Sequence, residues 1–173
     1  MGMIHINCGE GKGKTSAACG LAIRCAGYGK RVVIARFMKD NNSGELKILE
    51  RIEEITVLPI TRSFGFTWNM TDEDKKEAKV YYTEFLQKAI QTAKEQNASL
   101  LVLDEIIATY NYNLCEQKIL VEFLNSVPES LEVVMTGRNP AQELVELADY
   151  ISEIKKVKHP FDQGIPAREG IEY

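Results

Sequence analysis

The sequence predicts an α/β fold in which a mostly parallel sheet is covered by helices on both faces. Short apolar runs alternate along the chain with longer amphipathic runs, which is typical of parallel strands joined by crossover helices. A loop rich in glycine and lysine separates the first apolar run from the first helical run, and a later apolar run ends in two acidic residues. Such features are expected at the carboxyl edge of the sheet, where open α/β proteins bind ligands.

Five strands are expected from short apolar runs that are bounded by turn-forming residues. They cover residues 3–7, 32–37, 55–58, 100–103 and 132–135. Pro59 ends the third of them, and residues 61–69 form an irregular segment rich in aromatic side chains.

Four helices are expected between and after these strands. The first begins near Lys14 and ends near Gly27 or Gly29, and the second runs from a capping signal at Thr71 to about residue 96. The third covers residues 114–125. The fourth runs to about residue 148, with Asn139 as N-cap and Pro140 at the first helical position.

Length and composition favour one domain over residues 1–173, because a chain of 173 residues with 45% hydrophobic content can fill a single core. A net charge of −4 argues against nucleic acid as a main partner. No apolar run reaches the roughly 20 residues that cross a bilayer, and the N-terminus passes directly into a strand. We therefore expect a cytoplasmic protein without a membrane partner.

The loop at residues 8–16 reads Cys-Gly-Glu-Gly-Lys-Gly-Lys-Thr-Ser. Its glycines let backbone N–H groups turn inward on an anion, and the following helix adds its positive end. Lys14 is expected to reach phosphate oxygens, and Thr15 to offer its hydroxyl to Mg²⁺. The loop therefore predicts binding of a nucleoside triphosphate.

The loop departs from the usual G-x-x-x-x-G-K-[ST] spacing, because Cys8 stands where the first glycine belongs. Counted from Gly9 it is one residue shorter, so a different loop shape is expected. The alternative is a strand-to-helix turn that binds nothing, which the agreement of loop and flanking elements disfavours. Cys8 is also a candidate reactive thiol, because the helix N-terminus and Lys12 would lower its pKa.

Charged residues follow two of the predicted strands. Asp104 and Glu105 end the strand at 100–103, where a triphosphate enzyme holds Mg²⁺ directly or through water. The alternative is an acidic turn after a buried strand. Arg138 lies just beyond the strand at 132–135, and either neutralises phosphate charge or is merely solvated.

Two further segments do not fit a generic ATPase. Phe66 and Trp68 lie one residue apart in a polar loop, and either cover the core or line a ligand site. Residues 155–164 place cations beside turn formers and, taken alone, could be a solvated tail.

Taken together, these segments resemble the ATP:corrinoid adenosyltransferases of the CobA/CobO/BtuR type over nearly the whole chain. The shortened loop 9–15, the aromatic segment 65–68, the strand end 102–105 and the stretch 157–164 carry the resemblance. Glu10 stands where relatives carry Asn, and we expect one nucleotide contact to change. Longer members place an extension before the first strand, and we expect a more exposed corrinoid without it.

The resemblance implies a P-loop NTPase-like (RecA-like) fold and a reaction in which Co(I) of a reduced corrinoid attacks C5′ of ATP and expels triphosphate. It implies that Lys14, Lys12 and Arg138 stabilise the leaving group and that Phe66 and Trp68 press against the corrinoid. Mg²⁺ would lie on Thr15, Glu105 and Asp104. The implied nucleotide-binding residues are Gly9, Glu10, Gly11, Lys12, Gly13, Lys14, Thr15, Ser16 and Arg24.

The resemblance further implies a homodimer and a flavodoxin-like or flavin reductant that supplies the electron for Co(I). Two other functions stay open at this point. A nucleotide kinase or regulatory ATPase would release ADP, and a nucleotide-binding module would deliver the corrinoid without chemistry.

Overall fold

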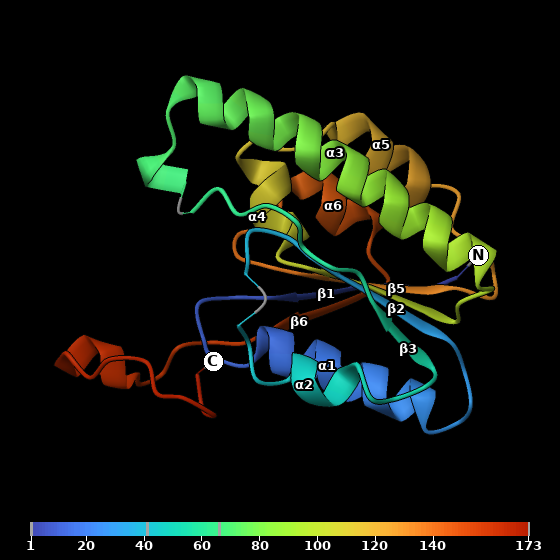
Figure 1. The fold of residues 1–173 in the computed structure, drawn as a ribbon, viewed down its shortest axis with the longest axis horizontal. Coiled ribbons are helices and arrows are strands. Elements are labelled where there is room, and N and C mark those ends of the chain that lie inside the picture. The colour runs from blue at the N-terminus through green and yellow to red at the C-terminus, as the bar shows by residue number, and fades with distance from the viewer. Residues whose placement is uncertain (1, 41, 66, 173) are drawn as a thin grey trace.

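The computed structural model describes residues 2–40, 42–65 and 67–172. Within them, the strands form one parallel sheet in the order β3-β2-β4-β5-β1-β6 (Figure 1). Their bounds are β1 Ile4–Cys8, β2 Val32–Arg36, β3 Ile55–Val57, β4 Leu100–Asp104, β5 Glu132–Thr136 and β6 Tyr150–Glu153. The five predicted strands are confirmed to within one residue at each end.

The edge strand β6 was not predicted from the sequence. It pairs in parallel with β1, from His5 opposite Tyr150 to Cys8 opposite Glu153. All four of its residues are exposed, so it lacks the buried apolar run by which the other strands were found. The strand is held by its ladder to β1 rather than by a buried face.

Helices cover both faces of the sheet, as expected. α1 (Lys14–Ala26) and the short α2 (Leu46–Leu49) lie on one face, and α3 (Asp72–Glu95), α4 (Ile106–Asn111), α5 (Gln117–Leu124) and α6 (Gln142–Leu147) on the other (Figure 1). Side chains alternate along the strands. Val33 and Leu101 belong to the larger core cluster on the α3 side, whereas Val32 and Leu100 pack with Ala18 of α1.

The capping signal at Thr71 is confirmed, because its hydroxyl accepts from the Asp74 amide while the Asp74 carboxylate accepts from the Thr71 amide. The predicted start of the last helix was wrong. Asn139 has a φ of 48° and belongs to the turn after β5, so α6 begins at Gln142. α5 also starts later than predicted, at Gln117, because buried Leu114 and Cys115 precede it as non-helical core residues.

The carboxyl ends of β1, β2, β4 and β5 meet at one edge of the sheet, beside the N-terminus of α1 (Figure 1). The chain after β6 leaves from this same edge, passes through the 3₁₀ turn η2 (Pro160–Gln163) and returns toward the start of α1. None of the helices in the described part of the chain is long and apolar enough to cross a membrane.

Candidate active site

The glycine-rich loop joins β1 to α1 and is folded around the side chain of Lys14. The Lys14 ammonium donates to the carbonyl oxygens of Gly9 at 2.7 Å and Gly11 at 2.8 Å. Burial, followed by the positive charge of Arg138, lowers the pKa of Lys14. The ammonium is thus held by neutral carbonyls, and a phosphate would offer it a stronger, charged partner.

Gly13 is the N-cap of α1 and has a φ of 120°, and in the described part of the chain no side chain caps the helix there. The first amides of a helix have no partner within the helix, and they carry the positive end of its dipole. Side-chain atoms are absent within 4 Å of the position of a Cβ on Gly13, among the described residues. The helix start therefore leaves room for an anion.

Gly9 and Gly11 are required for a different reason, which is close contact with another part of the chain. A Cβ on Gly9 would lie 2.5 Å from the carbonyl oxygen of Ile154, and one on Gly11 would lie 2.6 Å from the same oxygen. The Gly11 amide also donates to that oxygen at 2.7 Å. These two glycines let the chain after β6 pack directly on the loop.

Three polar groups gather around the carboxylate of Asp104, which is 1% exposed at the end of β4. The hydroxyls of Thr15 and Thr136 donate to Oδ1 at 2.9 and 2.6 Å, and the Lys39 ammonium donates to Oδ2 at 2.6 Å. Lys39 also donates to the Thr15 hydroxyl at 2.8 Å. The loop, the segment after β2, β4 and β5 are therefore joined by hydrogen bonds to one buried anion.

Glu105 follows with a left-handed backbone, φ 62°, and its amide donates to the Thr136 hydroxyl at 2.8 Å. Burial, and then the neighbouring charge of Asp104, raises the pKa of its carboxyl, while Lys39, Lys14 and Arg138 act in the opposite direction. Residues of this kind, held in an uncommon conformation by their surroundings, cluster at functional sites.

Arg138 forms an ion pair with the glycine-rich loop. Its guanidinium lies 3.1 Å from the Glu10 carboxylate, although both side chains are more than half exposed. The ion pair places Arg138 beside the loop, at the same edge as Lys14. Glu10 thereby has a cationic partner next to the loop.

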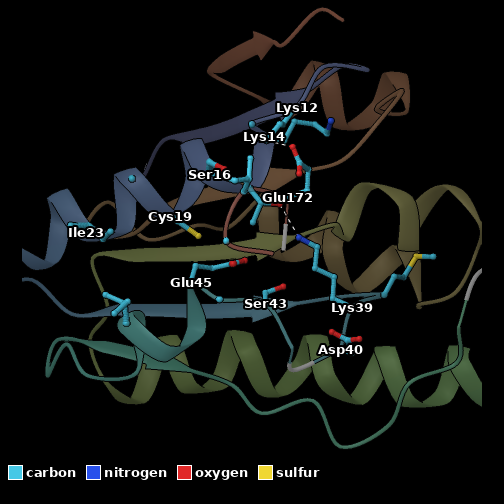
Figure 2. Close-up of a pocket in the computed structure, with 18 of the residues that line it drawn as sticks. Lys12, Lys14, Ser16, Cys19, Ile23, Lys39, Asp40, Ser43, Glu45 and Glu172 are labelled. Atoms are coloured by element: carbon cyan, nitrogen blue, oxygen red, sulfur yellow. Dashed lines mark hydrogen bonds and ion pairs between the residues drawn. The ribbon is translucent and has the colours of Figure 1, made fainter. Parts of the chain in front are cut away.

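A cavity of about 1030 Å³ opens next to the loop (Figure 2). Its lining includes Lys12, Lys14, Thr15 and Ser16 from the loop and α1, and Lys39 from the segment after β2. Figure 2 shows Lys39 pointing from that segment toward the loop. The volume lies at the upper end of the range of small-molecule sites.

The C-terminal segment forms another side of this cavity. Gly170, Ile171 and Glu172 line it, and the Glu172 carboxylate lies 3.3 Å from the Lys12 ammonium and 3.0 Å from the Arg168 guanidinium. A second cavity of about 310 Å³ adjoins it, lined by Lys12, Arg168 and residues 155–160. Hence Lys12 lies between the two cavities and is held by an acidic residue from the far end of the chain.

Arg24 is not brought into this arrangement, and the side chains of the two predicted aromatic residues are outside what the structure describes. Arg24 is exposed in the last turn of α1 and is absent from the cavity lining, whereas its neighbour Ile23 belongs to it. Phe66 lies outside the described residues, and nothing is described of the Trp68 side chain, although its backbone belongs to the turn η1 (Thr67–Asn69). Nearby Ser63 and Gly65 line the cavity, so the segment reaches it.

The expectation that Cys8 is a reactive thiol was wrong. Cys8 is 7% exposed, and burial, followed by the charge of Glu153, raises its pKa rather than lowering it. The opposing effect of Lys14 is smaller. The predicted helix and lysine are present, but desolvation outweighs them.

Lys39, Thr136 and Glu172 are site residues to which the sequence analysis gave no role. Thr136 and Lys39 follow or end strands at the carboxyl edge, so the rule that pointed to Asp104 also applied to them. Glu172 had no such signal, because it contacts the loop from 160 residues away.

Known proteins share both the sequence and the fold of this chain. Residues 1–173 match the family of ATP:corrinoid adenosyltransferases BtuR/CobO/CobP. A corrinoid adenosyltransferase of Escherichia coli is 35% identical over 174 residues, which cover 99% of this chain and 86% of that protein. One from Salmonella typhimurium is 33% identical with the same coverage, and one from Sinorhizobium sp is 32% identical, covering 99% of this chain and 80% of the relative.

Solved structures resemble it at the level of the fold. A KaiC-like protein from Pyrococcus horikoshii superposes with a TM-score of 0.60 at 15% identity, over 89% of this chain and 72% of that one. The cytoplasmic domain of EssC gives a TM-score of 0.53 at 16% identity, over 99% of this chain and 37% of that one. The expected P-loop NTPase-like fold is confirmed, and by its sequence over residues 1–173 the chain belongs to the ATP:corrinoid adenosyltransferase family.

Proposed function

We propose that this chain transfers the 5′-deoxyadenosyl group of ATP to Co(I) of a reduced corrinoid and releases inorganic triphosphate. The observation that carries the proposal is the match of the whole chain to this family, joined to an anion-binding loop that opens on a cavity of about 1030 Å³. The cobalt lone pair would form the bond to C5′ while the bond from C5′ to the triphosphate oxygen breaks. The negative charge then develops on the leaving triphosphate.

We infer that the loop stabilises this charge. Lys14 would exchange its bonds to the Gly9 and Gly11 carbonyls for phosphate oxygens. The first amides of α1 would add donors. Lys12 and Arg138 lie at the rim, where release of Glu172 and Glu10 would free their charges for the same task. ATP in the reversed orientation would leave C5′ facing the corrinoid.

Mg²⁺ fits the oxygen donors at the sheet edge. Within the described residues no group of three or more His, Cys, Asp or Glu could form an all-protein metal cage. Mg²⁺ in nucleotide enzymes takes one or two carboxylates plus substrate phosphates, and Thr15, Asp104 and Glu105 supply such a partial set. When bound, Mg²⁺ would neutralise charge on the triphosphate.

The remaining assignments of the proposal come from the resemblance. Phe66 and Trp68 would hold apolar surface against the lower face of the corrinoid and exclude its axial ligand, which eases reduction of Co(II). A flavodoxin-like or flavin reductant would supply the electron. We also propose that the chain forms one domain and that the protein is cytoplasmic. Arg24 would contact a phosphate. The protein would be a homodimer, which sedimentation would test.

The decisive experiment mixes the protein with Mg-ATP and chemically reduced cobalamin under anaerobic conditions. The cobalt spectrum is followed while triphosphate and ADP are assayed. We expect a light-sensitive cobalt–carbon product with one triphosphate for each corrinoid. ADP without alkylated corrinoid would instead indicate kinase or ATPase chemistry, and binding without any product would indicate a delivery module.

The role of the aromatic segment has its own test. Phe66→Ala or Trp68→Ala should slow adenosylation of Co(II) corrinoid far more than that of prereduced Co(I) corrinoid. The Co(II) substrate must first be reduced, which is the step that the aromatic residues would assist, whereas the Co(I) substrate needs only the transfer step. Equal losses with both substrates would exclude the proposed role.

A further inference from the structure

Lys39 occupies an unusual place at the sheet edge. It follows β2, and the residue before it, Met38, has a left-handed backbone with a φ of 53°. Such a conformation is uncommon for a residue with a side chain, and it persists where the surroundings impose it. The ammonium of Lys39 reaches two groups at once, Asp104 Oδ2 at 2.6 Å and Thr15 Oγ1 at 2.8 Å.

Asp104 and Thr15 are two of the three residues to which the proposed function assigns Mg²⁺. Both bonds of Lys39 go to oxygen atoms, and the carboxylate of Asp104 is 2% exposed whereas the Lys39 side chain is 25% exposed. A buried carboxylate without a counter-charge is costly, so the Lys39 ammonium neutralises the charge of Asp104. A metal ion that binds the same oxygens must take the ammonium's place.

The cavity offers the displaced ammonium a new partner. Lys39 itself lines the cavity next to Lys14 and Thr15, where the triphosphate would lie (Figure 2). A lysine has a flexible stem and a compact charge, so it can move between two anions without rebuilding the backbone. Phosphate oxygens would replace the bonds that Lys39 loses at Asp104 and Thr15.

We propose that Lys39 is a resident counter-ion that competes with the divalent metal for Asp104 and Thr15 and moves to the phosphates when Mg-ATP binds. The inference rests on the metal assignment of the proposed function and makes Lys39 a positioning residue. Its consequence is coupling between metal and nucleotide. The metal binds weakly alone, because it must break the bonds of the Lys39 ammonium to Asp104 and Thr15. Nucleotide removes this cost, and by reciprocity the metal strengthens nucleotide binding by the same factor.

The test measures binding of Mn²⁺ alone, by electron paramagnetic resonance, to the full chain without nucleotide. Lys39→Met removes the competitor, and we expect Mn²⁺ to bind about tenfold more tightly than to the unaltered protein, the size expected when a charged hydrogen bond is no longer displaced. Lys12→Met is the matched control, because it removes the same charge near the same cavity but contacts Glu172 instead. We expect it to change Mn²⁺ affinity by less than about threefold.

Two further variants separate charge from shape. Lys39→Gln keeps hydrogen-bond donors at this position but removes the charge, and this variant should also bind Mn²⁺ more tightly. It replaces Lys39→Met in the test if that variant fails to fold. Lys39→Arg keeps the charge and should bind Mn²⁺ no more tightly than the unaltered protein. Equal Mn²⁺ affinities in the unaltered protein and both neutral variants, or an equal gain in Lys12→Met, would overturn the proposal.

Failure of this inference can be told from failure of the proposed function. Mn²⁺ binding needs neither corrinoid nor ATP, so it reports on Lys39 alone. A protein that makes adenosylcorrinoid but whose Lys39 variants bind Mn²⁺ like the unaltered chain would overturn the counter-ion role and leave the activity standing.

Discussion

The cavity beside the loop has two sides that are built in different ways. The sheet edge carries buried Asp104 together with half-buried Lys14 and Thr15, and the polar side-chain atoms of all three are hydrogen-bonded. The C-terminal segment carries Glu172 on exposed chain, and ion pairs at the surface hold it to Lys12 and Arg168. Exposed pairs contribute little to stability, whereas buried networks are costly to disturb.

This difference suggests a division of work. A leaving group that gains charge is best stabilised by donors that do not reorganise, which favours the sheet edge. A site that must admit ATP and a corrinoid and release triphosphate also needs a side that opens at low cost, and the C-terminal segment has that character. Variants at the sheet edge should therefore change the rate of transfer or the stability of the fold strongly. Variants in the C-terminal segment should change ligand binding, and by less.

The largest effect is expected from Lys14→Met. The variant removes the ammonium that lies inside the loop, and we expect the rate of adenosyl transfer to prereduced corrinoid to fall by about 10²–10³-fold, as when one preorganised donor is lost. Lys12→Met is the comparison from the side of the C-terminal segment. It should cost about tenfold or less, because exposed Lys12 shares its charge with Glu172. Similar losses in both variants would remove the distinction between the two sides.

Thr136→Val tests whether the sheet edge is a network. The hydroxyl of Thr136 donates to Asp104 and accepts from the Glu105 amide, so its loss leaves two buried groups short of a partner. We expect the free energy of unfolding to fall by about 2 kcal/mol, measured by urea denaturation. Thr136→Ser keeps the hydroxyl and should lose less than half as much. If valine is as stable as serine, the hydroxyl does not hold the edge together.

Gly11→Ala acts where the two sides meet. A Cβ there would lie 2.6 Å from the Ile154 carbonyl oxygen and 2.8 Å from that of Lys155, so the chain after β6 must move away from the loop. We expect proteolytic cleavage in residues 155–172 to become about tenfold faster, from an overpacking cost of about 1–2 kcal/mol. Gly20→Ala, where a Cβ meets nothing within 4 Å, is the control and should leave cleavage unchanged.

The same comparison explains which parts could be predicted from the sequence. Residues 9–15 and Asp104 could be predicted from local spacing. Each lies at the end of a buried apolar strand, and the position of that strand fixes the position of the loop or the carboxylate. The roles of Lys39 and Thr136 could be predicted only with the strand order known, since they contact Asp104 from 65 and 32 residues away. β6 has no periodic signal, because all four of its residues are exposed. Glu172 has none either, because the residues before it in the C-terminal segment are exposed and show no burial pattern. Cys8 shows a further limit, since its pKa depends on burial that a motif does not state.

The smallest effect is expected from Glu172→Gln. Hydrogen bonds from the side chain and then the backbone of Arg168 lower the pKa of Glu172 from 4.5 to about 2. Because the folded pKa is depressed, the contact contributes fully above about pH 4.5 and is lost as the pH falls toward 2. At neutral pH the glutamine variant should free Lys12 and strengthen ATP binding by less than about fivefold, measured by calorimetry. A carbon-13 NMR titration of the Glu172 carboxyl should show the low pKa directly, and Glu169→Gln, an exposed change in the same segment, should leave both readouts unaltered. If Glu172→Gln weakens ATP binding instead, Glu172 supports the nucleotide rather than competing with it, and the C-terminal segment belongs with the sheet edge as a fixed wall of the site.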